Sequence, residues 1–202
     1  MSHYYDVQPD ARTNEKEITY QYQRHQLHLT TDAGVFSRDQ VDFGSDLLIQ
    51  TFLNAHPPGQ KKTILDVGCG YGPIGLMLAK VAPHDCVTMV DVNRRALSLV
   101  EKNAKRNQIT NVTVKESDGL SQVADETFQY VLTNPPIRAG KQIVHQILSD
   151  AYHVLEKQGM LYVVIQKKQG MPSAKKKMSD VFGNVESIKN SKGYHILKSV
   201  KC

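Results

Sequence analysis

Two short segments of this chain carry residue types that could do chemistry together. The first, residues 64–75, reads ILDVGCGYGPIG, an apolar run followed by glycines at every second or third position. Glycine lets the backbone turn tightly and lets a ligand approach the main chain without an intervening side chain. The second, residues 133–141, reads TNPPIRAGK. The first segment predicts a pocket for a nucleotide-type cofactor, and the second predicts a pocket for a planar amino group.

The glycine spacing alone leaves two cofactor classes open, because it also satisfies the nicotinamide-binding fingerprint. Three carboxylates give the context: Asp66 ends the first predicted strand, Asp91 ends the second, and Asp118 follows the third. Since the carboxyl ends of adjacent parallel strands line one crevice, these side chains would face the same ligand. Asp66 would repel a dinucleotide diphosphate. The set favours a sulfonium cofactor, with Asp91 accepting from the ribose hydroxyls and Asp118 from the adenine amino group.

The sequence Asn134-Pro135-Pro136 follows an apolar run that would end beside the glycine loop. The prolines fix the backbone and leave the Pro135 carbonyl without a neighbouring amide competitor. An exocyclic amino group on a ring is a poor nucleophile because its lone pair is delocalised. If the Asn134 side-chain oxygen and the Pro135 carbonyl each accept one of its hydrogens, the lone pair is aimed at the methyl carbon. The two segments together predict the transfer of a methyl group to a nitrogen.

Each of these motifs also has a structural interpretation that the residues alone leave open. Asp91 could cap the helix that follows its strand, and Asp118 stands in a Ser-Asp-Gly sequence that is typical of a turn. An isolated Asn-Pro sequence often only starts a turn. The position of Asn134 at the end of a fourth predicted strand, after a cofactor motif, favours the functional interpretation.

From residue 61 onward, short apolar runs alternate with amphipathic segments, which is the pattern of a parallel sheet flanked by helices. The apolar runs predict strands at 63–67, 86–91, 112–116, 128–133 and 159–166. Apolar residues at helical spacing predict helices at 94–106 and 142–155. Two later apolar segments, 184–189 and 194–200, are separated by Ser-Lys-Gly and predict a hairpin that closes one edge of the sheet.

The amino-terminal part is expected to form a cap at 1–60 over a catalytic core at 61–202, because residues 17–30 alternate like a strand pair and Asp46–Leu53 has a helical pattern. With 202 residues, 40% of them hydrophobic, the chain suits a single domain. It contains no apolar run of about 18 residues, and its first residues, MSHY, start no signal peptide. These features predict a cytoplasmic protein without a membrane partner. Three separated cysteines predict reduced thiols, and the eight histidines form no recognisable metal set.

The net charge of +5 is unevenly distributed along the chain. Residues 157–202 hold ten lysines against Asp180 and Glu186, a local balance of +8. Such a basic segment could contact the phosphates of a nucleic acid. The alternative is that Lys175-Lys176-Lys177 forms the solvated face of a helix.

The glycine loop with its spaced acids resembles the class I S-adenosylmethionine-dependent methyltransferase family over about residues 60–200. The resemblance implies an α/β fold with a Rossmann-like, doubly wound, seven-stranded mixed sheet, mostly parallel with one antiparallel edge strand, and helices on both faces. It implies S-adenosyl-L-methionine as the cofactor and S-adenosyl-L-homocysteine as its product. The implied cofactor-binding residues are Asp66, Gly68, Gly70, Gly72, Asp91, Val92, Asp118, Gly119 and Asn134.

Residues 134–141, together with TDAGVFS at 31–37, look like the small-subunit (16S) ribosomal RNA guanine-N2 methyltransferase family. This implies ribosomal RNA or the small ribosomal subunit as the partner, with Asn134, Pro135 and Pro136 as the catalytic residues. The implied substrate contacts are Phe36, Arg138 and Lys141. Amino-methyltransferases that act on adenine or on protein glutamine generally carry an aromatic residue after the second proline. Ile137 stands there in this chain, which disfavours those substrates and leaves the stacking of the target base open.

Longer relatives in that family carry a second, degenerate domain, for which this sequence has no recognisable counterpart. We therefore expect the chain to recognise RNA with its own cap and basic tail, or to act as a homodimer. Two other function classes stay open. One is methylation of another RNA or DNA base or of a protein side-chain amide, and the other is a nucleotide-binding module or dehydrogenase without transfer chemistry.

Overall fold

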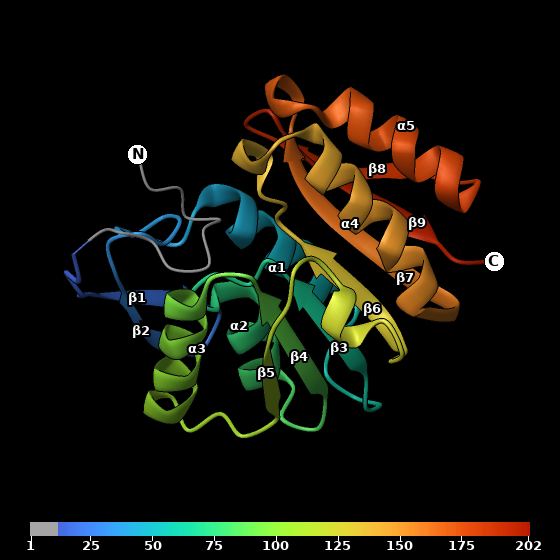
Figure 1. Ribbon diagram of the computed structural model, residues 1–202. Coiled ribbons are helices and arrows are strands. Elements are labelled where there is room, and N and C mark those ends of the chain that lie inside the picture. The colour runs from blue at the N-terminus through green and yellow to red at the C-terminus, as the bar shows by residue number, and fades with distance from the viewer. Residues whose placement is uncertain (1–11) are drawn as a thin grey trace.

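The computed structural model describes residues 12–202, in which seven strands form one sheet with helices on both faces (Figure 1). The strands are β3 Thr63–Val67, β4 Cys86–Asp91, β5 Val112–Glu116, β6 Phe128–Thr133, β7 Leu155–Gln166, β8 Glu186–Ser191 and β9 Tyr194–Val200. They lie in the order β5-β4-β3-β6-β7-β9-β8. The first five pair in parallel, and β9 runs antiparallel to both of its neighbours. The predicted fold class is confirmed, and the antiparallel strand lies one place in from the edge.

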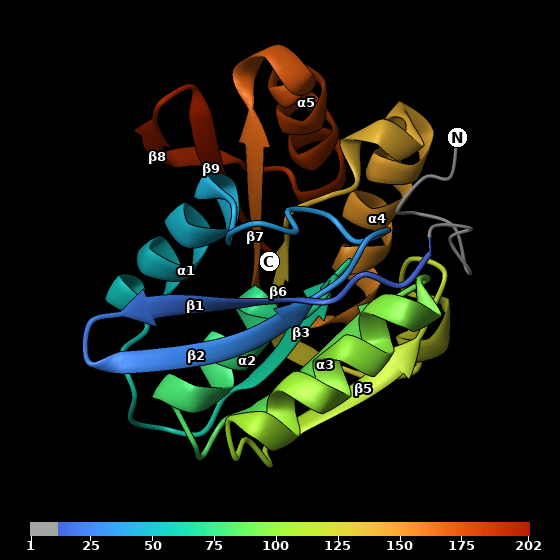
Figure 2. The same ribbon diagram turned by 90° about the vertical axis from the view of Figure 1, so that its left-hand side faces the viewer.

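The helices divide between the two faces of the sheet (Figures 1 and 2). They are α1 Phe43–Ala55, α2 Pro73–Val81, α3 Arg94–Arg106, α4 Lys141–Val154 and α5 Met171–Phe182. The first three cover one face, and α4 and α5 cover the other. Because successive strand residues point to opposite faces, Ile64 of β3 belongs to the buried cluster that includes residues of α2 and α3, whereas Leu65 belongs to the cluster that includes residues of α4 and α5.

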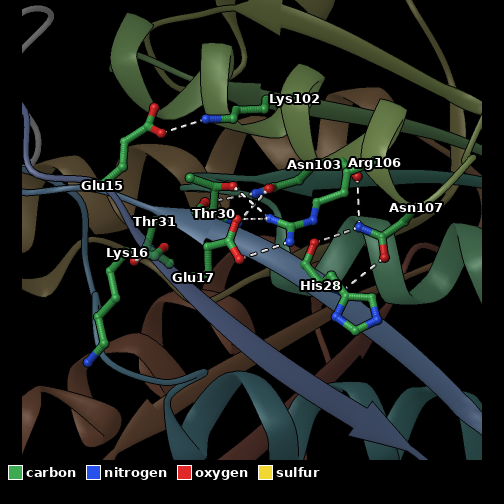
Figure 3. A network of polar contacts seen from close by, with 10 residues as sticks. All are labelled: Glu15, Lys16, Glu17, His28, Thr30, Thr31, Lys102, Asn103, Arg106 and Asn107. Atoms are coloured by element: carbon green, nitrogen blue, oxygen red, sulfur yellow. Dashed lines mark hydrogen bonds and ion pairs between the residues drawn. The ribbon is translucent and has the colours of Figure 1, made fainter.

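A separate hairpin of β1 (Lys16–Tyr22) and β2 (His25–Thr31) lies against α3 (Figure 2). Asn103 of α3 pairs with the main chain of Thr30, accepting from its N–H at 2.7 Å and donating to its carbonyl at 3.0 Å (Figure 3). Asn107, one turn later, pairs in the same way with His28, at 2.9 and 2.8 Å. These amides satisfy polar groups that an unpaired strand edge would otherwise leave open. The hairpin therefore has a fixed place beside α3.

The hairpin and α1 occupy the region predicted as a cap. Residues 1–11 of that cap lie outside the described residues, and the boundary between cap and core at residue 60 stays a prediction.

The order of the strands changes direction at β3, in the centre of the sheet. Strand β3 pairs with β4 on one side and with β6 on the other. In open α/β sheets this arrangement opens a crevice at the carboxyl ends of the strands. The glycine loop leaves β3 there, Asp91 ends β4, and Asn134 follows β6. The fold thus brings both sequence motifs to one crevice.

Most predicted element bounds agree with the structure, and the exceptions have physical causes. Strand β7 begins at Leu155 rather than at residue 159, because its pairing with β6 passes through an irregularity before Met160. The lysine-rich segment forms α5, in which Ala174 and Met178 are buried while Lys175 and Lys176 are exposed. The three lysines at 175–177 therefore belong to a helix.

Within residues 12–202, no helix is both long and apolar enough to cross a membrane. The same residues contain no group of three or more His, Cys, Asp or Glu side chains placed to hold a metal ion.

Candidate active site

A cavity opens at the switch point of the sheet, and both sequence motifs line it. Ten of the predicted site residues border the cavity: Phe36, Gly68, Gly70, Asp91, Val92, Gly119, Asn134, Pro135, Pro136 and Arg138. Four others do not border it: Asp66, Gly72, Asp118 and Lys141. The fold therefore places most of the predicted site residues around one cavity, and the other four lie outside its lining.

The glycine loop presents bare main chain to the cavity. Gly68 and Gly70 have φ of +70° and +56°, and a Cβ added to either would have no heavy atom within 4 Å. This open cradle is what a ligand needs to approach the backbone closely. Gly72 has another role, because a Cβ there would lie 2.8 Å from Leu76 Cδ1. It starts α2 and allows that helix to pack tightly.

Asp66 lies beneath the loop and is fully buried. Its Oδ2 accepts from the Gly75 N–H at 2.9 Å, which ties the end of β3 to the start of α2. Its Oδ1 has no hydrogen-bond partner within the described residues. Burial raises the pKa of the Asp66 carboxyl to about 7, more than the bond from Gly75 lowers it. Asp66 is therefore placed to support the glycine loop.

Asp91 lines the cavity, and its two carboxylate oxygens connect the glycine loop with the start of α3. Its Oδ2 accepts from the Gly70 N–H at 2.8 Å, and its Oδ1 accepts from the Asn93 N–H at 2.9 Å. Burial raises the pKa of Asp91 above its ordinary value, against these bonds. The helix-cap alternative does not apply, because the residue that caps α3 is Asn93, which accepts from the Ala96 N–H at 3.1 Å. A carboxylate oxygen can accept more than one hydrogen bond, so Asp91 retains capacity for a ligand.

The end of β5 contributes Ser117 and Gly119 to the cavity rather than Asp118. The Ser117 hydroxyl donates to the Gly119 carbonyl at 3.0 Å and accepts from the Gln122 N–H at 3.1 Å. Asp118 is exposed. The predicted contact of Asp118 with the adenine amino group stays a prediction.

The Asn134 side-chain amide is anchored by the start of α1. Its Nδ2 donates to Asp42 Oδ2 at 3.2 Å and to Ser45 Oγ at 3.1 Å. Because a carboxylate only accepts hydrogen bonds, the Asn134 atom that faces Asp42 must be the nitrogen. The side-chain oxygen Oδ1 must therefore face away from Asp42. The amide thus has the orientation that an acceptor role for Oδ1 requires.

Asp42 and Ser45 are absent from the site predicted from sequence, although both line the cavity. Asp42 caps α1 by accepting from the Ser45 N–H at 3.0 Å. An aspartate three residues before a buried serine, at the start of an apolar helix, is a recognisable cap signal. That signal predicts where the helix begins. It does not reveal the contact with Asn134, which lies 92 residues away.

The predicted substrate contacts have three different environments. Phe36 lines the cavity and is 46% exposed, and Arg138 lies in the short helical turn η2, Ile137–Ala139. Lys141 starts α4 and instead borders a separate hollow with Gln142, His145, Gln146, Ser149 and Lys177. Burial and the charges of Lys141 and Lys177 lower the pKa of His145. This second hollow is therefore a cationic site outside the main cavity.

Three further lining residues come from the far end of the chain and were not predicted: Gln166, Gln169 and Tyr194. Gln166 and Tyr194 are register partners on β7 and β9. No local pattern in the sequence marks them, because their place at the cavity follows from the return of β9 beside β7.

A model of the family described as "Methyltransferase small domain" matches residues 26–198, which is most of the chain. This chain belongs to the methyltransferase small domain family. Membership confirms the predicted methyltransferase class and, at the level of the family and fold, S-adenosyl-L-methionine as the cofactor. The open glycine cradle and the Asp91 carboxylate fit such a group, since they offer close backbone approach and acceptors for hydroxyls.

Among curated proteins, this methyltransferase small domain is similar to the uncharacterized protein YbxB of Bacillus subtilis (strain 168), with 46% identity over 98% of each chain. It is 33% identical to the ribosomal RNA large subunit methyltransferase G of Photobacterium profundum, over 88% of this chain and 47% of that protein. It is 30% identical to the ribosomal RNA small subunit methyltransferase C of Erwinia tasmaniensis, over 90% of this chain and 52% of that protein. The chain thus spans about half the length of these two ribosomal RNA methyltransferases.

Among solved structures, the T. thermophilus 16S rRNA N2 G1207 methyltransferase (RsmC), in complex with AdoMet and guanosine, superimposes with a TM-score of 0.85. The match covers 96% of this chain and 52% of that chain at 21% sequence identity. At that identity, the likeness shows that the two methyltransferase domains share a fold.

Proposed function

We propose that this protein transfers a methyl group from S-adenosyl-L-methionine to the exocyclic N2 of a guanine in 16S ribosomal RNA. The observation that carries this proposal is the orientation of Asn134, whose Nδ2 is bound by Asp42 and Ser45. With the nitrogen occupied, Oδ1 is the acceptor that a substrate amino group would meet. Asn134 and the glycine loop line the same cavity, so donor and acceptor groups can meet there.

The protein's own residues would act by positioning the amino group. Asn134 Oδ1 and the Pro135 carbonyl would each accept one hydrogen of the amino group, which aims its lone pair and increases electron density on the nitrogen. Pro136 keeps the backbone after Pro135 rigid. When bound, S-adenosyl-L-methionine supplies a sulfonium methyl group, which leaves S-adenosyl-L-homocysteine after transfer.

The electrons and the proton balance without a strong base. A bond forms between the nitrogen and the methyl carbon, and the electron pair of the broken carbon–sulfur bond stays on sulfur. The methylated nitrogen is acidic and loses its extra proton to solvent.

The cofactor contacts we propose are those implied by the resemblance: Asp66, Gly68, Gly70, Gly72, Asp91, Val92, Asp118, Gly119 and Asn134. Asp66 and Gly72 would act through the loop, because neither borders the cavity. Asp91 would bind the ribose hydroxyls directly.

Two relatives with ribosomal RNA methyltransferase names support RNA as the substrate, and the small-subunit one supports 16S RNA. The large-subunit relative makes large-subunit RNA the second candidate. Arg138 and the cationic hollow at Lys141 and Lys177 would contact RNA phosphates. A homodimer would enlarge that basic surface.

The test is to incubate the protein with radiolabelled S-adenosyl-L-methionine and, in parallel, 16S RNA, small subunits, large-subunit RNA and large subunits. The RNA is then digested to nucleosides and separated. We expect labelled N2-methylguanosine from the 16S RNA or small subunits, formed about 10²- to 10³-fold more slowly by Asn134→Ala. Labelled N6-methyladenosine would contradict the guanine assignment, and label found in protein rather than RNA would contradict an RNA substrate.

A further inference from the structure

The replacement of an aromatic residue by Ile137 leaves open which ring receives the target base. A base must leave its stack to reach a buried cofactor, and an aromatic plane usually receives it. Among the described residues, three aromatic side chains line the cavity: Phe36, Tyr71 and Tyr194. The surroundings of these three rings indicate which of them can receive a base.

Tyr71 is committed to the protein interior. It is 2% exposed, and its hydroxyl donates to the Ser37 carbonyl at 3.2 Å. Burial raises its pKa well above the ordinary value for tyrosine. Its ring has little surface to offer a base.

Phe36 lies on the cofactor side of the cavity. The two residues that precede Val35 are tied to the start of α3, where Arg95 donates to the Ala33 carbonyl at 2.8 Å and Asn93 donates to the Gly34 carbonyl at 3.3 Å. Helix α3 follows β4, the strand that ends in Asp91. Phe36 is therefore held near the groups expected to bind the cofactor.

Tyr194 lies on the opposite side, at the start of β9. Its register partner is Gln166, at the end of β7, and β7 is the neighbour of β6, the strand that Asn134 follows. Asp42, the anchor of Asn134, is close enough to raise the pKa of Tyr194 in addition to the effect of burial. Tyr194 thus shares its surroundings with the acceptor motif.

Three neighbouring residues restrict the Tyr194 ring. A Cβ on Gly44 would lie 2.9 Å from its Cε1, so only glycine at that position leaves room for the ring. The Phe43 ring packs against it with centroids 5.5 Å apart and a tilt of 54°. Gln166 flanks it as the register partner on β7. A ring that is held in this way and still borders the cavity is preorganised to receive a flat ligand.

We propose that Tyr194 is the substrate-binding residue on which the flipped purine base stacks, in place of the aromatic side chain missing at Ile137. This inference rests on the proposed function and names the base-binding wall of the same site. Stacking uses the ring and not the hydroxyl, so phenylalanine can replace tyrosine there and an aliphatic side chain cannot.

The test compares Tyr194→Leu with Tyr194→Phe, using the RNA that the nucleoside digest identifies. Loss of one base–aromatic stack should lower kcat/KM for RNA by about 5- to 100-fold in Tyr194→Leu. The Tyr194→Phe variant should stay within about twofold of wild type. Both variants should bind S-adenosyl-L-homocysteine like wild type in calorimetry, which also shows that they are folded. A Tyr194→Leu protein as active as wild type would overturn the inference.

A second measurement on the wild-type protein does not depend on a folded variant. Selective isotope labelling of tyrosine allows the Tyr194 ring signals to be assigned by their absence in Tyr194→Phe. Guanosine added with S-adenosyl-L-homocysteine should shift these signals upfield through the ring current of a stacked base, and unchanged signals would overturn the inference. If wild type forms N2-methylguanosine while Tyr194→Leu is unaffected, only this inference fails. If wild type methylates no RNA, the proposed function fails.

Discussion

The two halves of the cavity are built in different ways. The cofactor half uses the ends of β3, β4 and β5, and its polar groups are satisfied by near neighbours, as when Asp91 accepts from Gly70 and Asn93. The acceptor half is assembled from distant segments: Asp42 and Ser45 from α1, Asn134 after β6, and Tyr194 from β9. The cofactor half is formed by the glycine loop and the ends of adjacent strands. The acceptor half adds to its Asn134-Pro135-Pro136 motif side chains from α1 and β9 that only folding brings there.

This difference gives the two halves separable functions. The cofactor half offers bare backbone and a carboxylate, which bind a ligand without reacting with it. The acceptor half orients one amide, which matters only when a substrate nitrogen is present. Changes in the cofactor half should therefore alter cofactor binding, and changes in the acceptor half should alter turnover.

The largest effect is expected for Asn134→Ala, which removes a hydrogen-bond acceptor at the reacting nitrogen. Loss of one preorganised group of this kind lowers turnover by about 10²- to 10³-fold. The affinity for S-adenosyl-L-homocysteine should fall much less than turnover, because Asp91 and the glycine loop supply the other cofactor contacts and are intact. Single-turnover kinetics and calorimetry on the same preparation measure the two quantities. A parallel loss of affinity would break the separation of the halves.

The converse change, Asp91→Ala, should weaken S-adenosyl-L-homocysteine binding by about 10- to 100-fold, because it removes a charged acceptor and frees the Gly70 N–H. The rate at saturating cofactor should fall much less. Titration calorimetry followed by kinetics at several cofactor concentrations checks both statements. A rate that stays low at saturating cofactor would mean that Asp91 also contributes to the function of the acceptor half.

A pH effect of intermediate size is expected from Asp66, whose pKa burial raises to about 7. The folded protein then binds more protons than the unfolded chain between the two pKa values, so this group makes stability fall as pH rises towards 7. Between pH 5.5 and 7 the loss is at most about 2 kcal/mol. Denaturant titrations should show a shallower decline for Asp66→Asn. An identical pH profile would contradict the raised pKa.

The smallest effect is expected for Phe36→Ala, and its direction decides on which half Phe36 acts. From the anchoring of residues 33 and 34 to α3, we expect cofactor affinity to weaken by about three- to tenfold through lost apolar contact. The KM for RNA should stay within about twofold. A rise in the RNA KM alone would instead support the substrate contact predicted from the sequence motif.

The parts of the fold and of the site that could be predicted from sequence are those formed by contiguous residues. The strands at 63–67, 86–91, 112–116 and 128–133 agree with the structure to the residue, because each is a short segment with apolar or β-branched residues between polar breaks. The glycine loop and Asn134-Pro135-Pro136 were recognisable because each is contiguous. Helix α5 was less evident, since its buried stripe of Ala174, Met178 and Phe182 is interrupted by lysines.

The unpredicted part is the part that tertiary structure creates. Asp42 can be predicted as a helix cap, but only the packing of α1 places it beside Asn134. Tyr194 lies in a hairpin whose register with β7 decides where its side chain points. Neither relation leaves a local pattern. Asp66 was predicted as a cofactor contact because it ends β3, and its burial beneath the loop depends on how α2 packs.

The central claim is that Asp42 holds the Asn134 amide so that its oxygen accepts from the substrate amino group. An exchange of the two side-chain types tests it. In Asn134→Asp two carboxylates would meet, and the single-turnover rate should fall by about 10²- to 10³-fold. Combining it with Asp42→Asn restores a donor opposite an acceptor and leaves a carboxylate oxygen for the substrate. We expect the double variant to regain at least about tenfold in rate. A double variant as slow as Asn134→Asp would contradict it.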